Sequence, residues 1–151
     1  MDLREVIESA FAAVPYPGDD CIIAGSSEEG DELKTYFLRR SWRGHSAQQL
    51  RYHDSALGLF TEDALLYFLP AFLIASIEDP ETADTIPSRI LGIFTAPGNY
   101  KPQSHEAFDR FIKRFTTQQR DALLQVFERI YSDDDVAALK EVFRSHAVHA
   151  A

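Results

Sequence analysis

The chain has 151 residues, a length typical of one domain, and 45% of them are apolar, which is enough to build a sizeable core. Its 24 acidic residues outnumber the 15 basic ones, and the net charge of −9 argues against general nucleic-acid binding and favours basic partners. The single cysteine, Cys21, cannot form an internal disulfide, so we expect a cytoplasmic protein.

The first predicted helix covers residues 3–14, where apolar residues recur at helical spacing and Asp2 serves as the N-cap. Pro15 and Pro17 end it, since proline cannot continue a helix. Four of the first eight residues of the chain are charged, which leaves no apolar stretch for a signal peptide. The segment "CIIAG" that follows is either a short extended piece or an ordered loop.

Two further helices are predicted before the middle of the chain. The first covers residues 31–42, with its apolar side chains directed inward. The second covers residues 46–57, because Ser46 and Gln49 have the spacing of a capping box.

The most apolar segment is "ALLYFLPAFLIA", which lies in a predicted helix over residues 62–78 that Thr61 caps. Its 12 residues are too few for a membrane span, which needs about 20, so we predict a central buried helix and no membrane. Pro70 removes the hydrogen bond to the carbonyl of Leu66 and should kink or split the helix. The favoured explanation is structural; the other is that this carbonyl faces a functional cavity.

The last part of the chain is strongly periodic. We predict a helix over residues 82–97 with Pro87 in its first turn, and a surface loop over residues 96–104. Three apolar stripes follow, with a capping box at Thr116 and Gln119 and an acidic start, "SDDD", for the last helix.

Alternating strand patterns are nearly absent, and no linker separates two domains. We therefore predict one all-α domain over residues 1–151. It should be a compact bundle of about six to eight helices around a Pro-kinked central apolar helix.

No motif points to catalysis, a cofactor or a metal. The chain lacks a nucleophile elbow, a P-loop and a dinucleotide fingerprint. A calcium loop starting at Asp133 would lack its glycine and its glutamate. His105 and Asp109 offer two ligands, which do not make a site, and His146 and His149 are expected in a solvated tail. These absences favour a non-enzymatic role without excluding an enzyme.

One stretch departs from the acidic average, because residues 34–53 hold five basic residues and no acid, while the remainder carries a net charge of −14. Arginine beside aromatic residues is typical of recognition surfaces. The other interpretation is internal neutralisation by the acids of residues 19–32. With one tyrosine from the apolar helix, the candidate binding residues are Arg39, Arg40, Trp42, Arg43, His45 and Tyr67.

Residues 37–80, "FLRRSWRGHSAQQLRYHDSALGLFTEDALLYFLPAFLIASIEDP", resemble a family of small uncharacterised bacterial proteins with a segment of the form "LTxEAFxYFLPAYL". The residues that fit this pattern are Phe37, Trp42, Phe60, Thr61, Tyr67, Phe68, Leu69, Pro70, Ala71 and Leu73. The match is inexact, because the chain has Phe60 where the pattern has the leucine before its threonine, and two leucines at residues 65–66 where the pattern has a phenylalanine. The resemblance implies a bacterial cytosolic setting and an architectural Pro70, and it implies no activity.

Our leading expectation is a non-enzymatic protein-binding domain of the bacterial cytosol whose acidic surface contacts a basic partner; an immunity or antitoxin-like protein is one concrete form. The alternative is a small-ligand sensor or enzyme with an anion-binding pocket near Pro70. That pocket would be lined by Tyr67, the carbonyl of Leu66, Arg39, Arg40 and Arg43. Nucleic-acid binding through residues 34–53 is a weaker third possibility, because the surrounding negative field repels phosphate.

Overall fold

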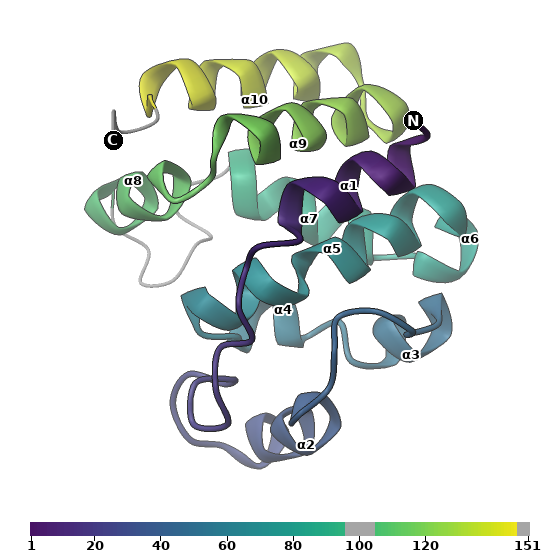
Figure 1. Ribbon diagram of the computed structural model, residues 1–151, viewed down its shortest axis with the longest axis vertical. Coiled ribbons are helices and arrows are strands. Elements are labelled where there is room, and N and C mark those ends of the chain that lie inside the picture. The colour runs from purple at the N-terminus through teal and green to yellow at the C-terminus, as the bar shows by residue number, and fades with distance from the viewer. Residues whose placement is uncertain (96–104, 148–151) are drawn as a thin grey trace. The chain divides into compact units, whose positions relative to one another are not determined.

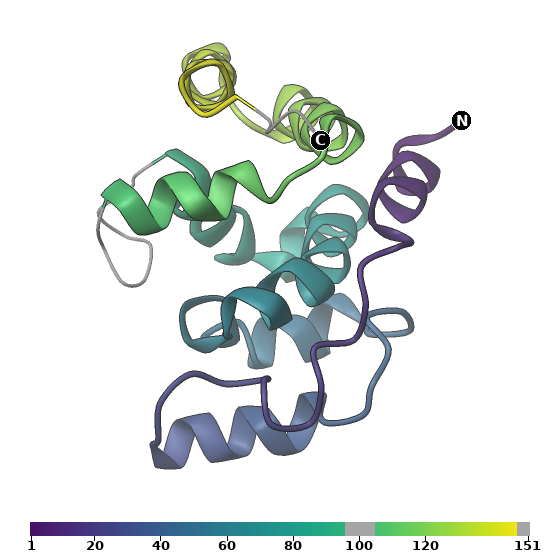
Figure 2. The same ribbon diagram turned by 60° about the vertical axis from the view of Figure 1, so that its left-hand side comes forward.

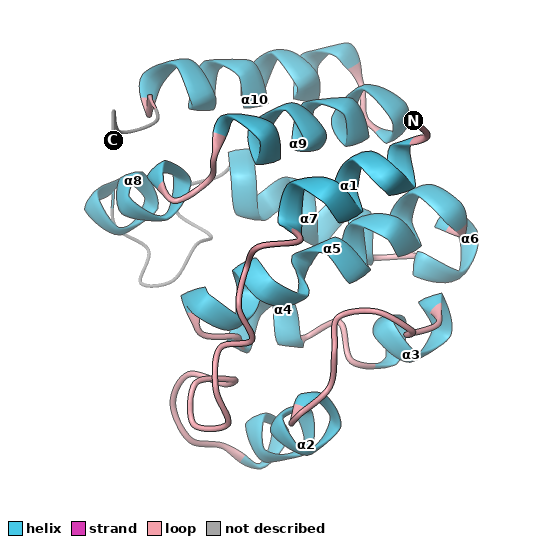
Figure 3. Cartoon of the chain, viewed as in Figure 1, coloured by secondary structure: helices cyan, strands magenta, loops and turns pink. Residues whose placement is uncertain are grey.

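The computed structural model describes residues 1–95 and 105–147, so the predicted loop over residues 96–104 and His149 lie outside the described residues. Within them the chain forms ten helices and no strand, which confirms the all-α class (Figure 3). Seven of the helices have at least seven residues. The total exceeds the predicted six to eight because three short helices occur where continuous helices or turns were expected. None of these helices combines the length and the apolarity that a membrane span requires.

Contacts divide the chain into two compact units: unit 1 is Met1–Ala10 with Pro87–Ala151, and unit 2 is Phe11–Ile86. The single domain over residues 1–151 stays a prediction. The helices, labelled in Figure 1, are α1 Leu3–Phe11, α2 Glu28–Phe37, α3 Ala47–Tyr52, α4 Ala56–Leu59, α5 Glu62–Glu78, α6 Pro80–Ala83, α7 Ile86–Thr95, α8 His105–Lys113, α9 Thr117–Ile130 and α10 Asp133–Ser145.

Unit 2 is built around α5, as the apolar segment predicts. Its bounds match the prediction, and the Thr61 hydroxyl accepts a hydrogen bond from the amide of Ala64. Every residue from Ala64 to Ser76 is buried except Tyr67, which is half-buried. The helix is not split, because it continues through Pro70. Contacts join α5 to both α3 and α6, and α2 to α4.

The bounds predicted for α2 are wrong at both ends. Ser27 caps the helix by accepting from the amide of Gly30, so the helix begins three residues before the predicted start. It stops at Phe37 because Leu38 leaves the helical region and Arg39 adopts a left-handed conformation with φ of 58°. The basic residues after Phe37 therefore lie in a connection and not on a helix.

Three other predicted helices are shorter or divided. The first ends at Phe11, where a turn precedes the prolines. The helix predicted over residues 46–57 is divided into α3 and α4, although its capping box at Ser46 and Gln49 is confirmed. The helix predicted over residues 82–97 is likewise divided into α6 and α7, because Asp84 between them has φ of 52°. "CIIAG" belongs to the loop before α2, and within it only Ile23 forms an isolated bridge, with Phe60.

Unit 1 packs its helices around phenylalanine rings. Phe94 on α7 lies 5.4 Å from Phe115 and 6.0 Å from Phe111 between ring centroids, and it also contacts Phe127 on α9. Helices α9 and α10 lie side by side, as Figures 1 and 2 both show in green and yellow. Gln118 donates to the hydroxyl of Ser9 and so connects α9 to α1.

A buried arginine joins the C-terminal ends of two helices in unit 1. Arg120 donates to the carbonyl of Ile112 at 2.9 Å and to those of Phe115 and Phe143 at 3.2 Å each. The last carbonyls of a helix have no partner within that helix, and α8 ends at Lys113 while α10 ends at Ser145. Arg120 therefore adds donors at these helix ends, where the carbonyl of Ile112 also accepts from the amide of Phe115, and its guanidinium lies over the Phe143 ring. No local pattern in the sequence indicates this buried cation.

Candidate functional site

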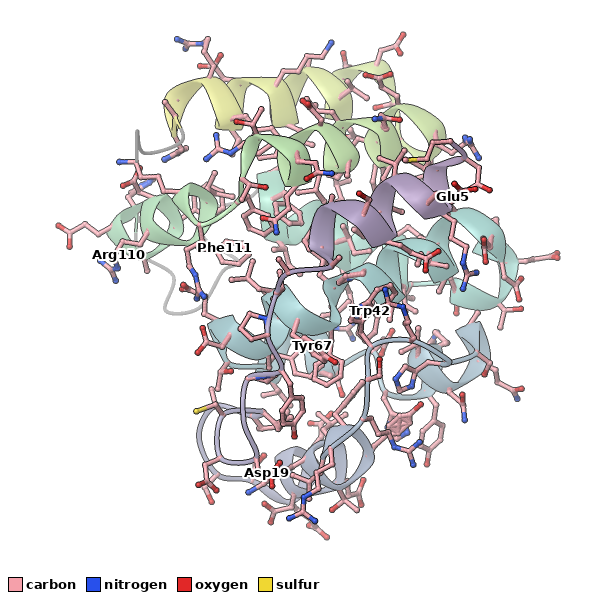
Figure 4. The ribbon with its side chains drawn as sticks, viewed as in Figure 1. Glu5, Asp19, Trp42, Tyr67, Arg110 and Phe111 are labelled. Carbon is pink, nitrogen blue, oxygen red and sulfur yellow. The ribbon has the colours of Figure 1, made fainter. Side chains whose placement is uncertain are left out.

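The candidate binding residues all belong to unit 2, but they divide into separate local groups. Figure 4 labels Asp19 in the loop before α2, Trp42 in the connection after it and Tyr67 on α5. Arg39, Arg40, Trp42, Arg43 and His45 lie between α2 and α3.

One group, which we call the Tyr36 cluster, consists of Tyr36, Arg40, His45 and His53. The Arg40 guanidinium carbon lies 4.8 Å from the centre of the Tyr36 ring. The ring centres of His53 and His45 lie 4.0 Å and 5.5 Å from the same ring. Side chains from α2, from the connection after it and from the end of α3 thus converge on one phenol.

Hydrogen bonds define the protonation pattern of His45. Its Nε2 lies 2.7 Å from the carbonyl oxygen of Ser41, and its Nδ1 lies 2.6 Å from the Tyr36 hydroxyl. A carbonyl only accepts, so Nε2 carries the proton, and Nδ1 of the neutral ring accepts from Tyr36. Both ring nitrogens are therefore engaged, which leaves neither available as a general base.

The electrostatics of the cluster favour neutral imidazoles. Burial, together with the positive charge of Arg40, lowers the pKa of His45, although its bond to the Ser41 carbonyl acts in the opposite direction. Burial and Arg40 also lower the pKa of His53, while Glu32 opposes the shift. Partial burial raises the pKa of Tyr36. The cluster therefore holds one permanent cation beside two groups that resist a second positive charge.

Arg39 belongs to a different group. Its Nε donates to Asp19 at 3.0 Å, and its backbone amide donates to the Tyr16 hydroxyl, which in turn donates to Asp19. The hydrogen bond from Tyr16, followed by that from Arg39, lowers the pKa of Asp19. Tyr67 contacts this group through an edge-on ring contact with Tyr16 at 5.7 Å. An acid of residues 19–32 thus neutralises one of the basic residues, Arg39.

The remaining basic residues have other local contacts. Arg43 lies over the Trp42 ring, with its guanidinium carbon 4.2 Å from the ring centre. Arg51 bridges Asp54 and Asp84, at 3.4 Å and 3.1 Å. Asp54 is buried and also accepts from the hydroxyl of Thr85 at 2.6 Å, so this group serves structure.

The acidic residues of the loop before α2 and of its first turns form a second candidate surface. We call the exposed members the acidic surface: Asp20, Glu28, Glu29, Asp31 and Glu32. Within the described part of the chain, none of these five carboxylates makes an ion pair. Acids in a first turn favour the positive helix end, which explains their position, but they remain open to a partner.

The histidine predictions for unit 1 are corrected in one respect. His146 does not lie in a solvated tail: its Nδ1 lies 2.6 Å from Asp109, and its ring contacts Phe108 edge-on. Asp109 also pairs with Lys113 at 2.9 Å, and these two partners lower its pKa. Across residues 1–95 and 105–147, no group of three potential ligands is placed to hold a metal ion.

Sequence reasoning placed Arg40 and His45 among the candidates but missed Tyr36 and His53. Tyr36 lies on α2, but Arg40 follows the left-handed turn at Arg39, so helical spacing does not account for their contact. The approach of His53 depends on how α3 folds back on α2, which no local pattern indicates.

Comparison of the chain with protein-family models, with curated proteins and with solved structures gives no match.

Proposed function

We propose that this chain is a non-enzymatic protein-binding domain of the bacterial cytosol, and that its acidic surface contacts a basic partner protein. An immunity or antitoxin-like protein that covers a basic toxin is one concrete form of this role. Complementary charge of this kind speeds encounter and selects partners.

The observation that carries the proposal is the excess of acidic over basic residues in unit 2. This unit has 13 acidic and five basic residues, a net charge of −8. Arg39 and Arg51 are engaged with acids of the same unit. The five carboxylates of the acidic surface make no such pair among the described residues, so their negative field extends into solvent.

The test is capture of partners from a lysate of the source organism by the purified chain. The variant replaces four acids by amides: Glu28→Gln, Glu29→Gln, Asp31→Asn and Glu32→Gln. The matched control changes four exposed acids of α9 and α10, two of them also in a first turn: Asp121→Asn, Glu128→Gln, Asp133→Asn and Asp134→Asn.

We expect one stoichiometric partner at about 0.1 M salt and its loss at about 1 M, where the Debye length falls from about 10 Å to about 3 Å. The acidic-surface variant should bind roughly tenfold or more weakly, while the control binds as the wild type does. Thermal unfolding of each variant checks that it is folded. Capture that survives high salt, or that both variants share equally, contradicts the proposal.

The alternative function, a sensor or enzyme with an anion pocket near Pro70, receives less support. All three of its arginines have other contacts: Arg39 pairs with Asp19, Arg40 lies over Tyr36, and Arg43 lies over Trp42. Tyr67 contacts Tyr16 and Phe68. We also propose that Pro70 kinks α5 for packing reasons. A Pro70→Ala variant that keeps partner binding would agree with that structural role.

A further inference from the structure

We propose that the Tyr36 cluster is a binding site for a phosphate group, with Arg40 and His53 as its direct contacts. This inference does not rest on the protein-binding proposal, although Glu32 of the acidic surface also acts on His53.

Arg40 has no acidic partner among residues 1–95 and 105–147. Its side chain is exposed and lies over the Tyr36 ring, and across the described residues it makes no ion pair. Its neighbour in sequence differs, because Arg39 pairs with Asp19. The cation–π contact fixes the guanidinium and leaves its N–H groups available for an oxyanion, to which arginine binds through two parallel bonds.

The second argument concerns the two imidazoles. His45 uses both ring nitrogens, with Tyr36 and with the carbonyl of Ser41, and so acts as a support for the Tyr36 ring. His53 is half-buried, 4.0 Å from the Tyr36 ring centre, and makes no ring hydrogen bond within the described residues. His45 thus positions the Tyr36 ring, and His53 keeps an N–H donor for a ligand.

The third argument is the charge balance around His53. The charged and titratable groups that act on it are Arg40 and His45, which lower its pKa, and Glu32, which raises it. Burial contributes most to the lowered pKa of His53, and among the charged groups Arg40 contributes most. A dianion bound there would stabilise the imidazolium form of His53, because opposite charges at close range favour ionisation. A phosphate group suits this site better than a carboxylate, since it carries two charges and three exposed oxygens.

The experiment follows the ring signals of the histidines by NMR while inorganic phosphate is added at constant ionic strength. Sulfate repeats the titration across pH, because its charge does not change near neutrality, and acetate serves as a planar monoanion. The ring signals of His105, which is exposed on α8 in unit 1, provide a reference in the same sample.

We expect phosphate and sulfate to move the His53 signals in a saturable way and to raise the pKa of His53, so that sulfate binds more tightly as pH falls. Acetate should have little effect. Arg40→Gln should weaken phosphate binding roughly tenfold or more, and without ligand it should raise the pKa of His53 because a neighbouring cation is lost. Arg144→Gln, an exposed arginine of unit 1, should bind phosphate as the wild type does.

The proposal is overturned if His53 and His105 respond alike to phosphate, because that result indicates general ion screening. It is also overturned if Arg40→Gln binds phosphate with unchanged affinity. Thermal unfolding of Arg40→Gln beside the wild type shows whether this variant keeps its fold. Failure here leaves the acidic surface untouched, since that surface is tested by amide variants of α2.

Discussion

The two units of this chain differ in net charge. Unit 2 has a net charge of −8, and five exposed carboxylates on it make no ion pair among the described residues. Unit 1 has 11 acidic and ten basic residues, a net charge of −1. In its described part, the charged groups of Asp109, Arg120 and Glu141 all have local partners. The net negative charge of the chain is thus concentrated in unit 2.

Two arginines illustrate the same contrast. Arg120 is buried and satisfies three carbonyls at helix ends, so it serves the fold. Arg40 is exposed, lies over one tyrosine ring and has no acidic partner in the described residues. Both stack on an aromatic ring, so stacking alone does not distinguish a structural arginine from a binding one. The difference lies in whether the N–H donors are already used.

The largest expected effect is at Arg120. Replacing it by methionine keeps much of the volume but leaves the carbonyls of Ile112, Phe115 and Phe143 without this donor. We expect Arg120→Met to lower the free energy of unfolding by about 3 kcal/mol, because each buried unsatisfied group costs about 1–3 kcal/mol. Urea unfolding measures it. Arg129→Met, on the exposed side of the same helix, should change it by less than about 0.5 kcal/mol. Equal effects would contradict the structural role.

The next effect is at Asp54, the buried carboxylate of unit 2. Its side chain is 8% exposed, whereas that of Asp84, the other acid bridged by Arg51, is 61% exposed. Asp54→Asn removes an ionised acceptor from Thr85 and Arg51, and we expect a loss of about 2 kcal/mol. Asp84→Asn should cost less than about 0.5 kcal/mol, as an exposed pair does. A comparison of the two denaturation curves tests whether burial, and not charge, decides the cost.

A third prediction concerns pH. Burial lowers the pKa of His45 and of His53, so between their folded pKa values and the ordinary value of about 6.5 the unfolded chain binds more protons. This stability is fully present above about pH 6.5 and is lost as pH falls through the folded pKa values. Urea midpoints between pH 8 and pH 5 should therefore decline at the acidic end. The decline should be smaller in His53→Gln; an unchanged decline would contradict this assignment.

The smallest effect is expected at Arg39, whose pairing with Asp19 is superficial. The two side chains are 75% and 42% exposed, so the pair should contribute less than about 1 kcal/mol. Arg39 has φ of 58°, a conformation that costs a residue other than glycine about 1–2 kcal/mol. Arg39→Gly relieves this cost and should leave stability nearly unchanged. Arg39→Ala keeps it and should be the less stable of the two by thermal unfolding; because both variants lack the pair, the reverse order would contradict the backbone cost at this position.

The sequence predicts the helices whose signals are local. The bounds of α5 and the capping boxes at Ser46 and Thr116 follow from residues within one or two turns, and all three are confirmed. The end of α2 was missed because the left-handed turn at Arg39 carries no glycine to mark it. The divisions between α3 and α4 and between α6 and α7 were missed because contacts of Asp54 with Arg51 and Thr85 hold these turns.

The candidate site is predictable only in part for the same reason. The excess of basic residues between positions 34 and 53 is visible in the sequence, and so is the acidic stretch before it. Which arginine pairs with which acid depends on how the loop that carries Tyr16 and Asp19 packs against the end of α2. That packing is not local, so the sequence could not separate Arg39, which is engaged, from Arg40, which is not.

The central claim is that the acidic surface is the contact for a partner protein. Hydrogen–deuterium exchange of the captured complex against the isolated chain measures this contact most directly. We expect slower amide exchange over residues 19–32 in the complex, with little change over α9 and α10. Slowing confined to residues of unit 1, or to residues 34–53, would show that the partner binds elsewhere and would contradict the claim.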